Sequence, residues 1–574
     1  MRWPTRRKRP TTVAERYRSL IDEAVDDSVF NLVGAVDDWL AAAMNHGSDD
    51  DRAEALHYRT VALVQRARDP VTLAERERLL ISNEGIPAEA GYWLARTQRT
   101  RDAVTAIETS RAVLYDRLTG WFDPTLLTAL HATGHARLLG RYTTALAALS
   151  DGYRDEYTRQ PALQPGMTVE GRHYATGHTT ALHAAAAEVD RLQQDIEKVT
   201  GQPIPPLEPI TYDLVQAAVA TMPVIYLAAA NDSGYALIVT DTAEPQPVWL
   251  PGLTAHAATR RVSELQEPNT RPQLLGSVDD TVRWLAETAL VPLADWIRAC
   301  PVLRTGPIGL VAVGVTGALP IAAALLQQDG PAVWHLPYAR TLTTDRQPLR
   351  PPWKVRICAA PQVPLLRRLP RTDRDITWLQ ERYGTHIRAA PDATRDDGIE
   401  ALREGDVVEL LCHGKSKPAT PLDSALCLTD GELTVRDLLS EDRIGARLAI
   451  LAACEGQRFD LRMSDEIIGL PLALHQAGTD AVIAGQWPVD DIPTGLLMRR
   501  LHDNLADGAH PAQALTQAQN WLRTSSRREL ADTYPNGYQM LSADGTLRPY
   551  SHPAHWAGFT CSGYLTTHSS GDRP

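Results

Sequence analysis

The sequence predicts an all-α region followed by an α/β domain, in which a mostly parallel sheet is flanked by helices. Two observations lead to this prediction. From about residue 13 to residue 200, apolar residues recur at helical spacing and β-branched runs are few. Beyond a proline-rich stretch at 201–213, short apolar runs alternate with helical stretches. Such alternation is typical of parallel sheets covered by helices.

Changes of composition along the chain set the expected boundaries. The first residues are basic and lack a following apolar segment, so they fit a disordered tail better than a signal peptide. The proline-rich stretch has the composition of a linker. We therefore expect a disordered basic tail at 1–12, a helical domain at 13–200, a linker at 201–213, an α/β domain at 214–567 with its core at 350–567, and a short tail at 568–574.

The helical region contains one stretch similar to a tetratricopeptide unit. In residues 132–157, Gly140 and Ala145 are small enough to let two helices approach, and Tyr142 and Leu146 fill the gap between them. Such repeats recur about every 34 residues, and weaker candidates lie at 53–67 and 95–114. An irregular helical bundle is the alternative, and the sequence does not decide between the two.

In the second region the strand candidates can be placed one by one. Two apolar runs around an Asn-Asp-Ser-Gly turn predict a β-hairpin near residues 223–240. The uncharged stretch 307–326 is long enough to span a membrane, but its glycines and Pro320 divide it into a strand, a turn and a helix. Further strands are expected at 308–313, 355–359, 407–411, 448–453 and 481–486.

Composition excludes several classes of protein. The net charge of −12 over 574 residues is spread along the sequence, which does not favour nucleic-acid binding. Six sparse cysteines without paired spacing indicate neither a disulfide framework nor a metal site. We expect a cytoplasmic protein that uses no cofactor and no metal and does not act at a membrane.

Two predicted strands end in residues that carry chemistry. The run VVELL stops just before Cys412 and His413, and LAILAA stops at Cys454, 41 residues after His413. Ligands of open α/β sheets bind beyond the carboxyl ends of the strands. If the two strands are parallel neighbours, the imidazole of His413 and the thiol of Cys454 face one crevice.

This pair of groups is suited to nucleophilic catalysis. A thiolate attacks carbonyl carbon, and a histidine can take the thiol proton and later give it to a leaving amine. The backbone N–H groups of Gly414 and Cys454 could hold the oxyanion of a tetrahedral intermediate. Glu455 would raise the pKa of an adjacent thiol, so we do not expect a preformed thiolate. Taken singly, either residue is as easily explained by core packing.

Six ordered blocks around these residues resemble the CHAT domain, a caspase-like peptidase domain related to separases. The resemblance covers about 285–565 and is most secure at 407–522. Two blocks carry the pair, LLCHGKS at 410–416 and LAILAACEG at 448–456. The others are PLDSALCL at 421–428, LTVRDLL at 433–439, the segment MSDEIIGL to WPVDD at 463–491, and HPAHWAGFTCSG at 552–563.

The resemblance implies a caspase-like fold and clan CD cysteine peptidase activity. It implies His413 as the general base or acid and Cys454 as the nucleophile, in a catalytic core at 350–567. A helical-repeat region that senses a partner commonly precedes such a domain, which suggests a role in bacterial-type signalling or defence. The chain departs from the family in having Leu411-Cys412 before the His-Gly pair and Gly456-Gln457 after the nucleophile. Neither change removes a catalytic group.

The substrate preference has two interpretations. Asp465 matches an acidic position common in the family, where a desolvated carboxylate would line a pocket for an Arg or Lys side chain. Alternatively, Ser464 or Asp465 caps a helix that runs to residue 477. Asp423, Asp490 and Asp491 also lie in family blocks and are as well suited to ordering loops or capping helices as to contacting substrate.

Two functions from different classes follow. The first is a cysteine endopeptidase that cleaves protein or peptide substrates with the His413–Cys454 dyad and is regulated by a partner acting on its helical region. The second is a catalytically silent scaffold that uses the helical repeats for interaction. Both catalytic residue types are present, which favours the first.

Overall fold

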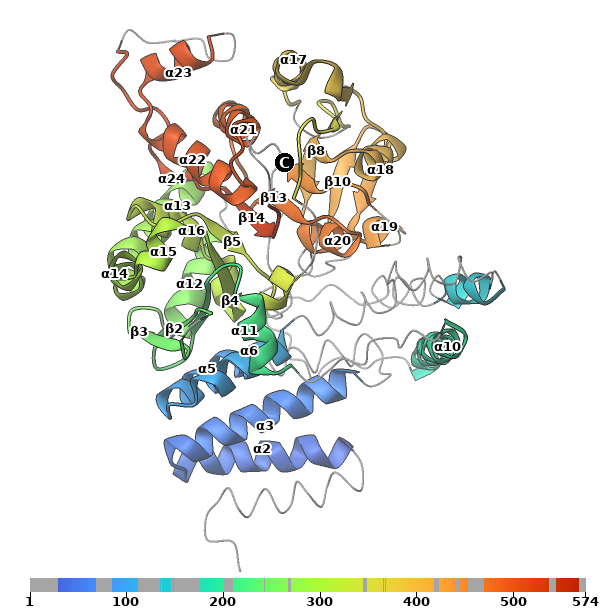
Figure 1. Ribbon diagram of the computed structural model, residues 1–574, viewed down its shortest axis with the longest axis vertical. Coiled ribbons are helices and arrows are strands. Elements are labelled where there is room, and N and C mark those ends of the chain that lie inside the picture. Colours follow the sequence, from blue (N-terminus) through green and yellow to red (C-terminus); the bar gives the residue numbers. More distant parts are fainter. Residues whose placement is uncertain are drawn as a thin grey trace, which may run out of the picture.

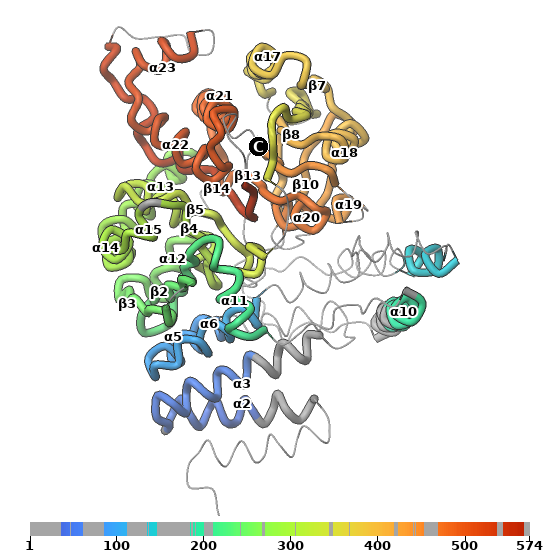
Figure 2. The backbone as a smooth tube through the Cα atoms, in the orientation of Figure 1, coloured from blue at the N-terminus to red at the C-terminus, as the bar shows by residue number. Residues whose placement is uncertain are grey.

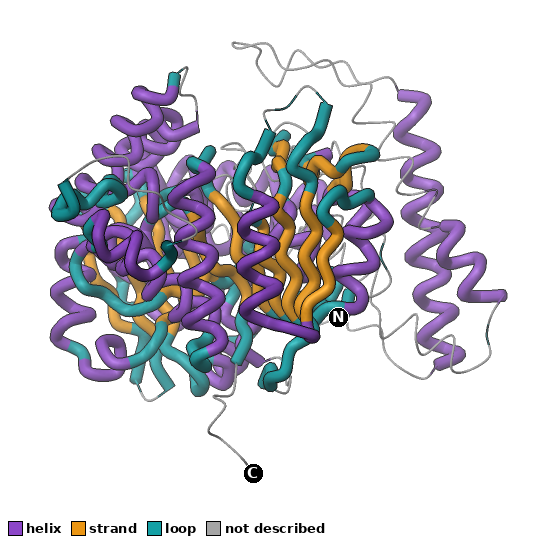
Figure 3. The backbone as a smooth tube through the Cα atoms, turned by 90° about the horizontal axis from the view of Figure 1, so that it is seen from above, coloured by secondary structure: helices purple, strands orange, loops and turns teal. Residues whose placement is uncertain are grey.

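The fold is known from a computed structural model of the chain. It describes residues 29–68, 85–111, 135, 137–145, 148, 176–200, 210–241, 243–266, 270–343, 348–364, 366, 368–417, 423–439, 441, 444–452, 469–535 and 544–566. Within them, helices occupy the N-terminal part and a large sheet with helices on both faces occupies the rest (Figures 1 and 3). This confirms the predicted fold class.

The N-terminal part contains only helices among its described residues. Their first turns show ordinary start signals: α3 begins with three aspartates, and α5 has a proline in its first turn. Figure 1 shows α2, α3, α5 and α6 stacked in order beside one end of the sheet, with α10 set apart from them. The helices are α2 (Val29–His46), α3 (Asp49–Arg68), α5 (Ile86–Arg96), α6 (Thr100–Ser110) and α10 (Thr176–Thr200).

The sheet has eleven strands in the order β3-β2-β1-β4-β5-β14-β13-β12-β8-β6-β7. All neighbours are parallel except β3/β2, β2/β1 and β14/β13. The strands are β1 (Val224–Ala229), β2 (Gly234–Val239), β3 (Gln246–Leu250), β4 (Ile308–Val313), β5 (Val333–His335), β6 (Val355–Ala359), β7 (Ile387–Ala390), β8 (Val407–Leu411), β12 (Leu448–Leu451), β13 (Ala481–Gly485) and β14 (Phe559–Gly563).

Helices cover both faces of this sheet (Figures 1 and 3). The α-helices are α11 (Tyr212–Ala218), α12 (Ala255–Gln266), α13 (Arg271–Trp284), α14 (Val291–Ala299), α15 (Pro301–Thr305), α16 (Ile321–Gln327), α17 (Thr372–Tyr383), α18 (Arg395–Glu404), α19 (Val435–Leu439), α20 (Leu470–Gln476), α21 (Asp491–Ala506), α22 (Pro511–Thr524), α23 (Arg527–Thr533) and α24 (Pro553–Trp556). Shorter turns are the π-helix η2 (Leu285–Ala289) and the 3-10 helices η3 (Gly314–Ala318), η4 (Ala339–Thr343) and η5 (Gly384–His386).

Strand alternation decides which face each side chain of β8 joins. Successive side chains of a strand point to opposite faces. Val407 and Leu411 join the core cluster that contains α21 residues, whereas Val408, Leu410 and Cys412 join the cluster that contains α18, α19 and α20 residues. Cys412 is therefore buried in the cluster on the face of β8 opposite to α21.

The N-terminal helices share a core with the sheet. Buried residues of α5 and α6 belong to the same apolar cluster as β1 and β2, and Figure 2 shows these helices beside α11. The fully buried carboxylate of Glu108 on α6 accepts hydrogen bonds from the Tyr226 hydroxyl at 2.7 Å and the Ala339 N–H at 2.8 Å. Arg111 donates to the carbonyls of Pro337 and Ala312. The helical region is therefore built onto the first half of the sheet.

Most of the predicted strands are confirmed within a residue or two. The hairpin is β1 and β2 joined by the Asn-Asp-Ser turn, and the uncharged stretch is β4, η3 and α16. No helix among the described residues is long and apolar enough to cross a membrane. Most of the predicted tetratricopeptide unit at 132–157 lies outside the described residues. Within its described part, Tyr142 is buried and its hydroxyl accepts a hydrogen bond from Gln193 of α10.

A second, smaller sheet was not predicted. His413 begins its strand β9 (His413–Lys415), which pairs with β10 (Ala425–Leu428), and β10 pairs with β11 (Gly431–Thr434). Thr429 and Asp430 turn β10 back into β11, whose first residue Gly431, at φ 154°, lies opposite Leu428. The helix ending at Gln476 begins at Leu470 with Gly469 as its N-cap, later in the sequence than predicted, and Ser464 and Asp465 lie outside the described residues.

Candidate active site

The two strands predicted to meet are parallel neighbours. Strand β12 pairs with β8, and Leu448 lies opposite Val407 while Leu451 lies opposite Leu410. The register offset is therefore 41 residues, the same as the separation of His413 and Cys454. Cys454, Glu455, Gly456 and Asp465 lie outside the described residues. Ala452, directly after β12, is the last described residue before this gap.

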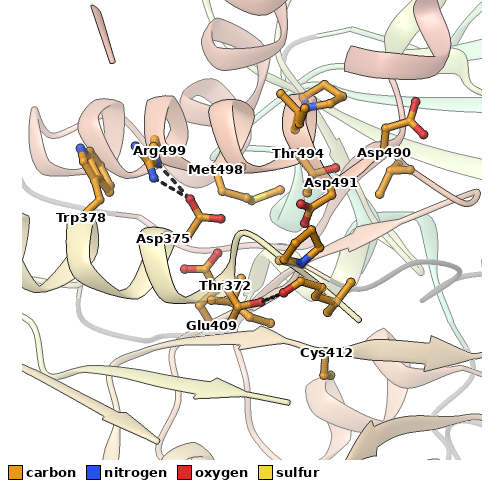
Figure 4. A pocket seen from close by; sticks show the side chains of 18 of the residues that line it. Thr372, Asp375, Trp378, Glu409, Cys412, Asp490, Asp491, Thr494, Met498 and Arg499 are labelled. Atoms are coloured by element: carbon orange, nitrogen blue, oxygen red, sulfur yellow. Dashed lines mark hydrogen bonds and ion pairs between the residues drawn. The ribbon is translucent and has the colours of Figure 1, made fainter. Parts of the chain in front are cut away.

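A cavity of about 590 Å³ opens at this end of the sheet, between α17 and α21 (Figure 4). Both His413 and Ala452 line it, so the cavity lies at the ends of β8 and β12. Its apolar lining includes Trp378, Leu411 and Met498. Its polar lining comprises Arg368, Thr372, Asp375, Glu409, Asp490, Asp491, Thr494, Arg499 and His502.

Glu409 is the most deeply buried carboxylate of this lining. It lies in the middle of β8, is 1% exposed, and its Oε2 is hydrogen-bonded to Nε2 of His502 on α21 at 3.0 Å. Nδ1 of His502 is hydrogen-bonded to the hydroxyl of Tyr383 at the end of α17, at 2.7 Å. Burial raises the pKa of the Tyr383 hydroxyl well above its ordinary value, so this hydroxyl keeps its proton. The three side chains tie α17 and α21 to β8.

A second ion pair spans the same two helices. Asp375 Oδ1 on α17 accepts from Nε and Nη2 of Arg499 on α21 at 3.0 and 2.8 Å. Burial raises the pKa of Asp375, and the Arg499 guanidinium partly opposes this shift. Gly495 makes the approach possible, because a Cβ at this position would lie 3.1 Å from Asp375 Oδ2. Figure 4 shows the two side chains facing each other across the helices.

Asp490, just before α21, does not cap the helix. It occupies the N-cap position without a side-chain capping hydrogen bond. Its Oδ2 accepts from Arg271 Nη2 at 2.5 Å and lies 3.3 Å from His555 Nδ1. These hydrogen bonds lower the pKa of Asp490, with the larger effect from His555. The predicted capping role is therefore not seen, whereas loop ordering and substrate contact stay predictions for this residue.

The sequence predictions missed several residues of the cavity. Asp375, Arg499, His502 and Trp378 come from α17 and α21, which carry no strand-end motif. Glu409 had a visible signal, since an acidic residue within the apolar run VVELL is rarely buried without a partner. Asp423, in another family block, accepts a hydrogen bond from Arg436 at 3.4 Å and does not line the cavity. Within the described ranges, no three His, Cys, Asp or Glu side chains are grouped so as to hold a metal ion.

Comparison with protein families gives one match, over residues 279–564, to the family described as the CHAT domain. The chain contains a CHAT domain. The resemblance to the CHAT domain found in the sequence is thereby confirmed. The match includes His413 and every cavity residue, and it begins after β1, β2 and β3 of the sheet.

Solved structures give similarities of low sequence identity. Two crystal structures of the Saccharomyces cerevisiae separase–securin complex each match over 97% of this chain, with a TM-score of 0.42 and identities of 9% and 10%. The matches cover 50% and 54% of those chains, so this chain spans about half their length. No curated protein sequence matches the chain.

Proposed function

We propose that the protein is a cysteine endopeptidase in which His413 and Cys454 form the catalytic dyad of the CHAT domain. The observation that carries the proposal is the parallel register of β8 and β12 at the mouth of a cavity. An offset of 41 residues that ends beside His413 and Ala452 supports a thiol next to an imidazole. The cavity has the size of a pocket for one or more substrate side chains.

The proposed reaction proceeds in two stages. His413 accepts the thiol proton as Sγ of Cys454 bonds to the substrate carbonyl carbon, and the N–H groups of Gly414 and Cys454 hold the oxyanion. The C–N bond then breaks, and His413 returns the proton to the leaving amine. Water adds to the thioester with His413 again as base, and the carboxylic acid and the thiol are released.

Regulation by the helical region is part of the proposal. The buried hydrogen bonds of Glu108 with Ala339 and of Arg111 with Ala312 support it, because a structural change in α6 would alter both contacts. We further propose a cytoplasmic location, where the catalytic thiol would remain reduced. The preference for Arg or Lys side chains through Asp465 likewise remains a proposal, and substrate profiling of the active enzyme would test it.

The decisive test is substitution of the nucleophile in the full chain. Cys454→Ala should abolish cleavage of a peptide library while the unfolding midpoint in urea stays within error. Cys300→Ala is a matched control, because this cysteine lies between α14 and α15 and outside the proposed site. We expect this variant to keep both the cleavage rate and the unfolding midpoint of the wild type. Undiminished cleavage by Cys454→Ala would refute the dyad.

Labelling separates the peptidase from the scaffold. A peptide carrying an electrophilic carbonyl should label Cys454 rapidly, and His413→Ala should slow the labelling by about 100-fold or more, the usual size of a general-base contribution. Slow labelling that is indifferent to His413→Ala would instead indicate the silent scaffold.

A further inference from the structure

We propose that Arg271 is a positioning residue for substrate, because it holds in place the loop that forms one wall of the cavity. This inference rests on the proposed peptidase function. The wall loop, defined as residues 486–490, follows β13 and leads into α21. Its residues Val489 and Asp490 line the same cavity as His413.

Backbone hydrogen bonds hold both ends of the wall loop. The Gln486 N–H donates to the Gly558 carbonyl at 2.7 Å, and the Asp490 carbonyl accepts from the Thr494 N–H within α21. Between these two points the loop contains Pro488, which has no N–H to donate. A side chain from elsewhere in the chain adds contacts at Pro488 and Asp490.

Arg271 supplies two of these side-chain contacts from a distant part of the sequence. Its Nη1 donates to the Pro488 carbonyl at 2.8 Å, and its Nη2 donates to Asp490 Oδ2 at 2.5 Å. One planar guanidinium thus fixes both the backbone and the carboxylate of the loop, a geometry that lysine cannot reproduce. Arg271 begins α13, whose buried side chains pack in the cluster shared by both halves of the sheet.

The family block at 552–558 supports the loop from the other side. His555 Nδ1 lies 3.3 Å from Asp490 Oδ2, and the Ala554 carbonyl accepts from Trp487 Nε1 at 3.4 Å. A Cβ at Gly558 would lie 2.7 Å from Val489, so only glycine leaves room for the wall. This gives the HPAHWAG sequence a function: it packs against the wall loop while Arg271 holds the loop's polar groups.

The two hydrogen bonds from Arg271 to Pro488 and Asp490 are called the clamp from here on, and the contacts of Asp490 define its chemical role. Asp490 Oδ2 is occupied by Arg271 and His555, so this carboxylate is engaged in holding the loop. Arg271 and Asp490 are 34% and 45% exposed, so the ion pair contributes little to global stability. Its effect is expected on the geometry of the wall, hence on substrate affinity more than on folding.

The test compares three variants of the full chain. Arg271→Ala removes both contacts, and Arg271→Lys can restore one of them. Arg283→Ala is the matched control, because in the described part of the chain Arg283 forms ion pairs with Asp279 and Asp280 of the same helix and none with the wall loop. Hydrogen exchange of a peptide containing the wall loop is expected to quicken in Arg271→Ala, to a lesser extent in Arg271→Lys, and not at all in Arg283→Ala.

Kinetics with a cleaved peptide provide the second readout. We expect KM to rise about tenfold in Arg271→Ala with kcat within about twofold, as for loss of a charge-assisted hydrogen bond that acts on binding. Unchanged exchange in the wall loop, or an equal effect of Arg283→Ala, would overturn the clamp. Absence of any cleavage by the wild-type chain would refute the peptidase proposal instead, and the exchange experiment would still decide on the clamp.

Discussion

At the scale of single residues, the cavity lining contains buried polar side chains at positions that apolar side chains could also fill. Glu409 and His502 are both almost fully buried and face each other from β8 and α21. Removing two such groups from water costs several kcal/mol, and only their mutual contact and further hydrogen bonds offset it. Their value therefore lies in fixing α21 over the strand ends.

We predict that His502→Leu lowers the free energy of unfolding by about 2 kcal/mol or more, because it leaves the buried Glu409 side chain without this hydrogen-bond partner. Replacing both residues together, as Glu409→Leu with His502→Leu, should cost much less, since both partners of the hydrogen bond are then apolar. Urea unfolding of Glu409→Leu, His502→Leu and the double variant measures this difference. Equal, additive losses would show that the two residues do not act as a pair.

The close approach of α17 and α21 gives a second residue-scale prediction. Gly495→Ala places a methyl group 3.1 Å from Asp375 Oδ2, tighter than an ordinary contact. The Asp375–Arg499 pair must shift, and we expect a loss of about 1 kcal/mol in stability together with weaker substrate binding. Gly276→Ala on α13, where a Cβ meets nothing within 4 Å, is the control and should be neutral or slightly stabilising.

At the scale of elements, α6 is joined to the sheet by a buried carboxyl group. Burial raises the pKa of Glu108 above its ordinary 4.5, and the Ala339 N–H, the Tyr226 hydroxyl and Arg340 only partly oppose this. A carboxyl whose pKa is raised by folding holds its proton more tightly in the folded chain. The stability it contributes is therefore complete below the unfolded pKa and is lost as the pH rises through the folded pKa.

Glu108→Gln should remove this dependence on pH. The amide oxygen still accepts from Tyr226 and Ala339 but carries no charge. We expect the free energy of unfolding of the wild type to fall more steeply than that of the variant as the pH is raised from about 4.5 toward neutrality. Glu244→Gln is the control, because this carboxylate is exposed, pairs with Arg101 and has a lowered pKa. A pH dependence unchanged in Glu108→Gln would exclude the carboxyl group as its source.

At the scale of the whole molecule, the extent of sequence prediction follows from how local each signal is. The strand ends and the hairpin were predictable because apolar runs and turn residues lie within a few positions of each other. The β10–β11 hairpin turns at Thr429 and Asp430, which are also adjacent in the sequence, although no hairpin was predicted there. The partner of Glu409 is 93 residues away, and that of Asp490 is 219 residues away. No periodicity in the sequence pairs such residues, because packing of helices on the sheet brings them together.

The shared core of the helices and the sheet leads to a prediction about truncation. A chain beginning at residue 210 lacks α5 and α6, which cover Tyr226 and Tyr235 of β1 and β2. Exposing this apolar face should abolish cooperative unfolding, with loss of near-ultraviolet circular dichroism and binding of a hydrophobic dye. A chain beginning at residue 29 keeps these helices and should unfold like the full chain. If the shorter chain instead unfolded cooperatively at the same midpoint, the helices would be a separable attachment, and regulation through the Glu108 contacts would have to be abandoned.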